Sequence, residues 1–272
     1  MMPDLSAMMA ITSLQNPRVK AAIRLQKRRE RNATGKMLVE GFPELELAVH
    51  SGARVEELFF CESLCRPEER PLLTTIGHTG AKLYSVSAMV MQKMAYRENP
   101  SAWLAVVDFP RRTLASLQLP VNPLLIVAEA VEKPGNLGAI LRSADAAGVH
   151  AVIVCDPATD LANPNVVRAS KGALFHVPVV EADAEQTLAW LRQQGIRLLA
   201  ATPAARHNHW QTDLTGPVAI AVGAEDTGLS DRLLQQADLQ VLIPMVGQVN
   251  SLNVAQALTL LVYEAVRQRQ PA

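Results

Sequence analysis

The sequence predicts an α/β protein with a parallel sheet in its C-terminal part and a smaller α/β unit in its N-terminal part. Apolar, strand-like runs alternate with helix-like segments along most of the 272 residues, a pattern typical of a sheet covered by helices. Residues 108–123 interrupt this alternation with three prolines, which indicates a linker. We therefore expect a first domain over 1–108, a linker over 109–123 and a second domain over 124–272.

The N-terminal part begins with a helix that we expect over residues 12–31. Val19 and Ile23 fall on one side of this helix, and basic residues cover the rest. After Gly35, short strand-like and helix-like segments alternate, which indicates a small α/β unit. The expected strands are 36–40, 57–61, 82–85 and 103–107, and the expected helices are 43–50, 68–76 and 87–94.

The C-terminal part carries the stronger signal, because several of its strand-like runs are continuously apolar. Runs of this kind are typical of parallel strands that are buried on both faces. The expected strands are 124–128, 149–155, 176–180, 197–201, 218–222 and 241–244, and the expected helices are 137–147, 163–172, 184–194, 230–237 and 254–268.

Charge is balanced overall, with 26 basic and 26 acidic side chains, but it is unevenly distributed. Residues 18–36 contain eight basic side chains and one acid, Glu30, so this segment carries 8 − 1 = +7. Such a segment suits phosphate contacts, although a solvated helix face that binds nothing has the same composition. The side chains that we expect to contact a polyanionic partner are Arg18, Lys20, Arg24, Lys27, Arg28, Arg29 and Arg31.

Several classes of protein do not fit the sequence. The longest apolar run, 123–131, is too short for a membrane span and contains Glu129. The first residues lack the basic cluster of a signal peptide, so we expect a cytoplasmic protein. The odd number of cysteines, Cys61, Cys65 and Cys155, fits reduced thiols.

Two common cofactor motifs and a zinc-site pattern are also absent from the sequence. No stretch reads GxGxxG, since Gly135 and Gly138 have only GxxG spacing, and there is no P-loop lysine motif. His207 and His209, with Asp213 beyond them, fit a metal site less well than an exposed polar loop. Cys61 and Cys65 have no second pair at zinc-site spacing, so we expect no metal.

Three loops follow predicted strands, and ligands of parallel α/β sheets bind beyond the carboxyl ends of strands. The loops are 132–142, 222–230 and 247–253. Each carries at least one glycine beside short polar side chains, and glycine allows a ligand to approach the backbone closely. For Asn253, which precedes the last helix, a simple capping role remains an alternative.

Together these loops resemble the three signature motifs of the SpoU (TrmH-like) branch of the SPOUT RNA methyltransferases. The first loop and its helix resemble the N-x-x-x-x-x-R motif from Asn136 to Arg142, and the second resembles G-x-E-x-x-G-L from Gly223 to Leu229. Residues 243–253 resemble the I-P-M-x-G-x-x-x-S-L-N motif in full. A looser resemblance links residues 11–107 to the substrate-binding region of rRNA-directed members, an α/β fold akin to some ribosomal proteins.

The resemblance implies transfer of a methyl group from S-adenosylmethionine (SAM) to a ribose 2′-hydroxyl, by a homodimer whose C-terminal domain holds SAM in a deep trefoil knot. The implied cofactor contacts are Gly223, Ile243 and Leu252, largely through their backbone, with Met245 and Thr202 nearby. The implied catalytic residues are Asn136, Arg142, Glu225, Ser251 and Asn253.

The implied reaction needs alignment and removal of one proton rather than metal chemistry. Because a guanidinium stays protonated near neutral pH, we expect Arg142 to clamp a phosphate and stabilise the developing alkoxide, with Glu225 orienting Arg142 or holding the loop. The resemblance makes ribosomal RNA the expected substrate, bound by the basic side chains between Arg18 and Arg31. The alternatives are a tRNA 2′-O-methyltransferase, a noncatalytic RNA-binding or ribosome-assembly protein, and a small-molecule enzyme that leaves the basic segment without a role. Lys133, Asp226 and Ala255 depart from the family pattern, so the target nucleotide is left open.

Overall fold

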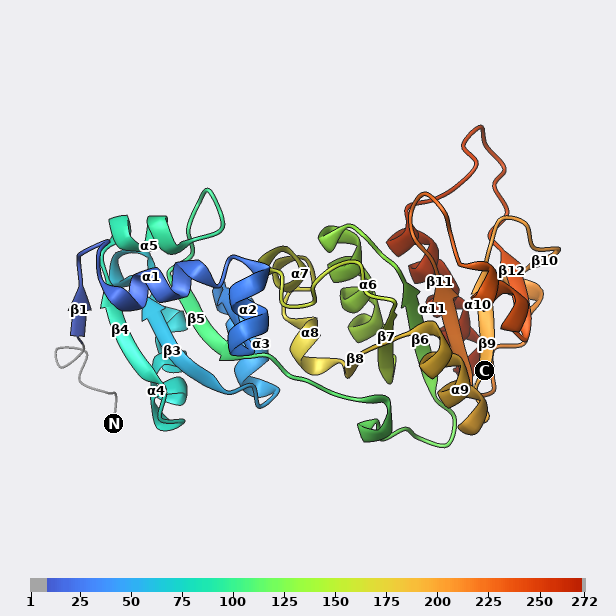
Figure 1. Ribbon diagram of the computed structural model, residues 1–272, viewed down its shortest axis with the longest axis horizontal. Helices are drawn as coiled ribbons and strands as arrows, with labels where there is room; N and C mark the ends of the chain where they lie inside the picture. Colours follow the sequence, from blue (N-terminus) through green and yellow to red (C-terminus); the bar gives the residue numbers. More distant parts are fainter. Residues whose placement is uncertain (1–8, 271–272) are drawn as a thin grey trace. The chain divides into compact units, whose positions relative to one another are not determined.

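The computed structural model describes residues 9–270, which group into two compact units (Figure 1). Unit 1 contains residues 9–110 together with 160–176, and unit 2 contains 111–159 and 177–270. No helix among the described residues is both long and apolar enough to cross a membrane.

Unit 1 is built on a five-stranded sheet in the order β1-β4-β3-β5-β2. Strand β5 runs antiparallel to both of its neighbours, whereas β4 runs parallel to both of its neighbours. The strands are β1 Met9–Ile11, β2 Lys36–Glu40, β3 Val55–Phe60, β4 Lys82–Val86 and β5 Trp103–Asp108. The helices are α1 Pro17–Arg24, α2 Arg28–Thr34, α3 Phe42–His50, α4 Pro71–His78, α5 Ala88–Met94, α7 Pro164–Ala169 and α8 Ala173–His176, with short 3₁₀ turns at η2 Glu62–Leu64 and η3 Pro67–Glu69.

The single helix predicted over 12–31 is wrong, because the chain breaks between α1 and α2. The guanidinium of Arg31 folds back and donates to the carbonyl oxygens of Leu25 and Gln26, both at 2.8 Å. Carbonyl groups at a helix end need such partners, and here a side chain supplies them. The helix predicted over 68–76 is divided into η3 and α4, with Arg70 between them and Pro71 at the start of α4. The helix predicted over 163–172 ends at Ala169, and a separate short helix, α8, follows from Ala173.

Unit 2 contains a seven-stranded sheet in the order β10-β12-β9-β11-β6-β7-β8, and every pairing in it is parallel. The predicted α/β class with a parallel C-terminal sheet is therefore confirmed. The strands are β6 Leu124–Glu129, β7 Ala151–Cys155, β8 Val179–Ala182, β9 Arg197–Ala201, β10 His207–Asn208, β11 Val218–Val222 and β12 Leu239–Leu242. The helices are α6 Pro134–Ala146, α9 Ala184–Gln193, α10 Asp231–Gln236 and α11 Val254–Arg269, with 3₁₀ turns at η4 Leu114–Ser116 and η5 His209–Gln211.

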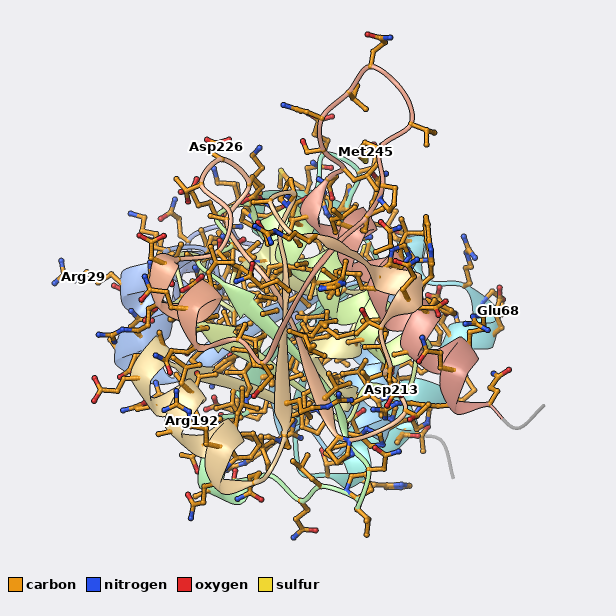
Figure 2. The ribbon with its side chains drawn as sticks, turned by 90° about the vertical axis from the view of Figure 1, so that its right-hand side faces the viewer. Arg29, Glu68, Arg192, Asp213, Asp226 and Met245 are labelled. Atoms are coloured by element: carbon orange, nitrogen blue, oxygen red, sulfur yellow. The ribbon has the colours of Figure 1, made fainter. Side chains whose placement is uncertain are left out.

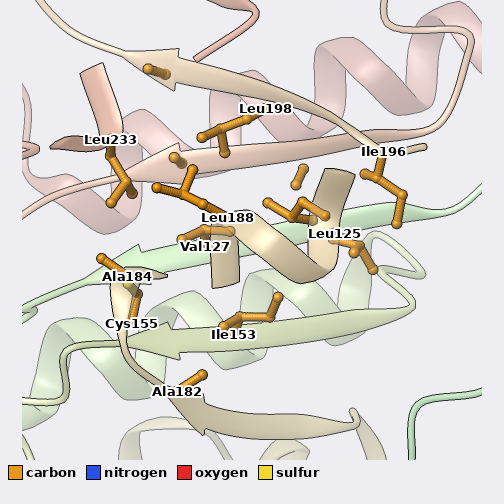
Figure 3. Packing of buried hydrophobic residues seen from close by; sticks show 14 of the residues in the cluster. Leu125, Val127, Ile153, Cys155, Ala182, Ala184, Leu188, Ile196, Leu198 and Leu233 are labelled. Carbon is orange, nitrogen blue, oxygen red and sulfur yellow. The ribbon is translucent and has the colours of Figure 1, made fainter. Parts of the chain in front are cut away.

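Helices cover both faces of this sheet. On one face, Leu125 and Ile153 of the strands pack against Leu188 of α9 and Leu233 of α10 (Figure 3). On the other face, α11 packs on α6 and β11. Three leucines of the predicted linker also pack against the hydrophobic cluster that contains Leu125 and Leu188; they are Leu114, Leu117 and Leu119.

Two short edge strands, β1 and β10, are missed by the sequence analysis, because two or three residues cannot display a period. The last strand ends at Leu242 rather than at 244, since Pro244 has no N–H for the ladder. Strand β8 begins at Val179 rather than at 176, because His176 ends α8 and Pro178 follows it. After β12 the chain continues into a long loop, 243–253, that extends away from the sheet before α11 begins (Figure 1).

Candidate functional site

The predicted cofactor residues gather at one edge of the sheet in unit 2. Thr202, Gly223 and Ile243 directly follow β9, β11 and β12, and these strands are neighbours in the sheet. The backbone N–H of Thr202 donates to the carbonyl of Val241 at 2.9 Å, which joins two of these strand ends. Figure 2 shows Asp226 and Met245 on two loops that project from this same end of the unit.

Three of the predicted catalytic residues form one hydrogen-bonded chain. The amide of Asn253 donates to the side-chain oxygen of Asn136 at 3.0 Å, and the amide of Asn136 donates to the carboxylate of Glu225 at 2.5 Å. Asn253 also accepts from the backbone N–H of Ala255 at 3.0 Å, so it caps α11 as well. The network therefore ties together α6, α11 and the loop that follows β11.

Glu225 is an ionised carboxylate in this network. Burial raises its pKa, but hydrogen bonds from the Asn136 side chain and from nearby backbone N–H groups outweigh burial, so the pKa lies below its usual value. One of these donors is the N–H of Glu132, at 3.3 Å. The carboxylate thus holds the loop 223–230 against the N-terminal end of α6.

Gly223 is needed where that loop leaves the sheet. A Cβ at this position would lie 2.1 Å from the carbonyl carbon and oxygen of Gly228 and 2.3 Å from the backbone nitrogen of Leu229. Ala224 and Gly228 also exchange two backbone hydrogen bonds, at 3.1 and 2.9 Å. The loop closes on itself so tightly that only glycine fits.

Arg142 and Ser251 stand apart from the network. Both side chains are exposed. Within the described chain Arg142 makes no hydrogen bond or ion pair, and the Ser251 hydroxyl donates only to the adjacent Asn250, at 3.4 Å. Of the two roles expected for Glu225, orienting Arg142 or holding the loop, its contacts fit the second, because Glu225 accepts from Asn136 and not from Arg142. The guanidinium of Arg142 is therefore available to bind a ligand.

The outer loop 243–253 presents apolar side chains to solvent. Ile243 and Met245 are half-buried, while Val246, Val249 and Leu252 are 100%, 64% and 36% exposed. Exposed apolar groups on a loop of this kind mark a surface that a ligand or partner covers.

A link between α6 and α11 is absent from the sequence prediction. The hydroxyls of Ser143 and Thr259 lie 2.7 Å apart, and Thr259 also donates to the carbonyl of Ala255 at 2.7 Å. Ser143 follows Arg142, so this contact fixes the turn of α6 that carries the arginine. Nothing in the sequence pairs these hydroxyls, because they are 116 positions apart.

The basic segment of unit 1 divides into exposed and engaged residues. Arg18 forms an ion pair with Glu57 at 2.6 Å and lies over the ring of Tyr84 at 4.9 Å. Arg31 is only 5% exposed, and its guanidinium donates to Asp160 at 2.5 and 2.9 Å. Arg31 is thus a structural residue and does not fit the predicted RNA surface. The exposed members are Lys20, Arg24, Lys27, Arg28 and Arg29, of which Arg29 points outward in Figure 2.

Replacing Arg31 by Met should destabilise unit 1. The change leaves Asp160 and two helix-end carbonyls without their donor, and we expect a loss of about 2–3 kcal/mol in the free energy of unfolding, because Asp160 regains only part of its hydration. Urea unfolding followed by tryptophan fluorescence measures it. Arg28→Met, on the same helix but exposed, is the matched control. Equal stability of the two variants would contradict the assignment.

The candidate metal residues do not form a site. His207 is exposed, His209 is buried, and Asp213 accepts from the backbone and hydroxyl of Thr215 at 2.9 and 2.6 Å. A group of Glu129, Cys155 and Asp156 lies within metal-binding reach. Burial, followed by the charge of Asp156, raises the pKa of Cys155 to about 12, so its thiol stays protonated. The absence of a metal remains a prediction.

Two family models match the chain. The SpoU rRNA Methylase family matches residues 123–263, and the MRM3-like substrate binding domain matches residues 16–105. Among curated relatives, the 23S rRNA (guanosine(2553)-2′-O)-methyltransferase RlmP of Bacillus subtilis is 30% identical, with 94% of this chain and 98% of the relative covered.

Two solved structures are similar over almost the whole chain. An RNA 2′-O ribose methyltransferase is 42% identical with a TM-score of 0.84, and the match covers 96% of this chain and 99% of that one. The SpoU methyltransferase AviRb of Streptomyces viridochromogenes, in complex with the cofactor AdoMet, is 31% identical with a TM-score of 0.85, over 93% of this chain and 99% of that one. The resemblance found in the three loops is confirmed, and the chain belongs to the SpoU rRNA Methylase family.

Proposed function

We propose that the protein transfers a methyl group from SAM to a ribose 2′-hydroxyl of ribosomal RNA. The observation that carries the proposal is the hydrogen-bonded chain of Asn253, Asn136 and Glu225 at the carboxyl edge of a parallel sheet. It unites three motifs in a member of a family whose relatives are named as rRNA 2′-O-methyltransferases.

The strand ends suit a cofactor that is held through backbone groups. Thr202, Gly223 and Ile243 follow neighbouring strands, and the lack of a side chain on Gly223 lets the loop fold close to the sheet. Met245 and Leu252, on the outer loop, supply apolar surface for an adenine ring or a methionine chain. Bound there, SAM would supply an electrophilic methyl group on a sulfonium.

Arg142 is the residue that we assign to the RNA backbone and the reacting oxygen. Its exposed guanidinium is unpaired within the described chain, and α6 carries it about 1.7 turns beyond Asn136. A guanidinium forks onto phosphate oxygens and stabilises negative charge as a hydroxyl loses its proton. Asn136, Glu225 and Asn253 position the surrounding loops, and Ser251 lies free to contact the ribose.

The exposed basic residues of α1, of α2 and of the turn between them are proposed as the RNA surface of unit 1. Replacing Lys27, Arg28 and Arg29 together by Ala should weaken RNA binding and lower the slope of log K against log salt by about 2–3, because fewer counterions are released. The affinity for SAM should stay unchanged. The matched control replaces three exposed basic residues of the same unit, namely Arg54, Arg66 and Lys82. An equal loss of RNA affinity in both variants would argue against a specific surface.

The proposal also includes a trefoil knot in unit 2. Its support is the strand order, in which β12 lies between β9 and β10 although the chain forms those two strands first. The connection 202–206 therefore passes the place that β12 later occupies, and the chain then continues to α11. Threading of this kind is rare in proteins. A crystal structure in which the C-terminal segment passes outside the connection 202–206 would contradict the proposed knot.

A cytoplasmic homodimer completes the proposal. Leu260 and Tyr263 lie one turn apart on α11 and are 47% and 45% exposed, which suits a face covered by a second copy. Sedimentation analysis that detects only monomer would contradict it.

Labelled SAM tests the central proposal. We expect label to enter rRNA, presented either as deproteinised RNA or as ribosomal subunits, and to protect one position from alkaline cleavage, since a methylated 2′-oxygen cannot attack the adjacent phosphate. Deproteinised tRNA serves as the comparison substrate. Binding of SAM without transfer to any RNA would favour a noncatalytic role, and absence of both would sink the proposal.

A further inference from the structure

Glu129 is a buried carboxylate that no motif assigns. It ends β6, is 3% exposed, and forms no ion pair within the part of the chain that the structure describes. Both of its oxygens accept hydrogen bonds from one residue: the backbone N–H of Ser230 donates at 2.7 Å and the Ser230 hydroxyl at 2.6 Å. A buried charge without a cation depends on such bonds, so this contact is a strong one.

The location of the contact is the base of the loop 223–230. In the register of β6 and β11, Ala128 pairs with Val222, so Glu129 lies beside Gly223, where the loop leaves the sheet. Ser230 is where the loop returns, and its hydroxyl also accepts from the N–H of Leu233 at 3.4 Å, at the start of α10. Two carboxylates therefore hold one loop, Glu129 at its base and Glu225 further along.

We propose that Glu129 is a positioning residue of the methyltransferase site. By holding Ser230 it keeps the loop closed, so that the backbone of Gly223 stays in the conformation that binds SAM. The inference rests on the proposed function for its ligand, and Glu129 itself touches no reacting atom.

Glu129→Gln is the direct test. The Gln side chain keeps one acceptor oxygen but turns an N–H toward the N–H or hydroxyl of Ser230, so the base of the loop should open. We expect the KM and Kd for SAM to rise about tenfold or more, while kcat at saturating SAM and the KM for RNA change less than about threefold. Asp231→Asn is the matched control, because it removes the same charge from an exposed neighbour.

Serine variants identify the partner. Ser230→Ala should weaken SAM binding, whereas Ser230→Thr, which keeps the hydroxyl and the N–H, should retain it. Adding Ser230→Ala to Glu129→Gln should cost little more than Glu129→Gln alone, because both act on one contact. If Glu129→Gln fails to fold, the SAM affinities of Ser230→Ala and Ser230→Thr are compared instead. Equal affinities of these two variants for SAM would overturn the proposal.

Hydrogen exchange separates this inference from the proposed function. In the ligand-free protein, amides of residues 224–229 should exchange faster in Glu129→Gln than in wild type or Asp231→Asn. If wild type binds no SAM, the proposed function fails, while the exchange rates still report whether Glu129 holds the loop. Unchanged exchange, or an affinity for SAM within twofold of wild type, would overturn the role of Glu129.

Discussion

Gly223→Ala should reduce SAM binding by roughly 10²–10³-fold and methyl transfer with it. The added Cβ would lie 2.1 Å from the backbone of Gly228, and backbone atoms cannot yield as a flexible side chain does. The loop must therefore move as a whole, which breaks the contacts of Glu225 with Asn136 and of Ser230 with Glu129. Calorimetric titration with SAM measures the loss.

The control for this variant is Gly216→Ala. Gly216 precedes the same strand, β11, at its other end, and the nearest atom to an added Cβ is a guanidinium nitrogen of Arg197 at an ordinary 3.7 Å. SAM affinity should match wild type there. A Gly223→Ala protein that binds SAM within threefold of wild type would show that the cofactor does not depend on this loop.

Arg142→Ala should lower kcat by roughly 10²–10³-fold, because the developing alkoxide loses its positive partner. The KM for SAM should change less than about twofold, since within the described chain Arg142 forms no hydrogen bond or ion pair with the loops that carry the cofactor residues. Arg142→Lys should restore little activity, as an ammonium cannot fork onto a phosphate. Single-turnover rates at saturating SAM and RNA measure the effect.

The comparison for Arg142 is Arg232→Ala, an exposed arginine on α10 that should leave both constants unaltered. If Arg142→Ala weakened SAM binding and left the single-turnover rate intact, the arginine would belong to the cofactor pocket rather than to the reacting oxygen.

The strands of the C-terminal sheet could be predicted because each one is recognisable from the apolar residues of a short, continuous stretch of sequence. The runs that became β6 and β11 are apolar throughout and buried on both faces, which a sequence displays directly. The helix expected over 12–31 fails for the opposite reason. Its periodicity continues through Leu25, whereas the break is held by a side chain of the next helix, the guanidinium of Arg31, which donates to the carbonyls of Leu25 and Gln26.

The candidate site shows the same division. The motifs identify Asn136, Glu225 and Asn253, but their mutual bonds join positions 89 and 117 residues apart, which no local pattern encodes. Glu129 is visible in the sequence only as an acid at the end of an apolar run. Its partner Ser230 lies 101 positions away, so the role of the pair emerges from the fold alone.

The chain of Asn253, Asn136 and Glu225 also sets the order in which the protein becomes competent during its own synthesis. Unit 1 is largely translated before unit 2, and its strands β1 to β5 can pair as they leave the ribosome. The hydrogen-bonded chain of the site cannot form at that early stage. Asn253 is translated 117 positions after its partner Asn136, and Asn253 can cap α11 only once that helix has also been translated. The hydrogen-bonded chain of the site can therefore form only after α11 has been translated.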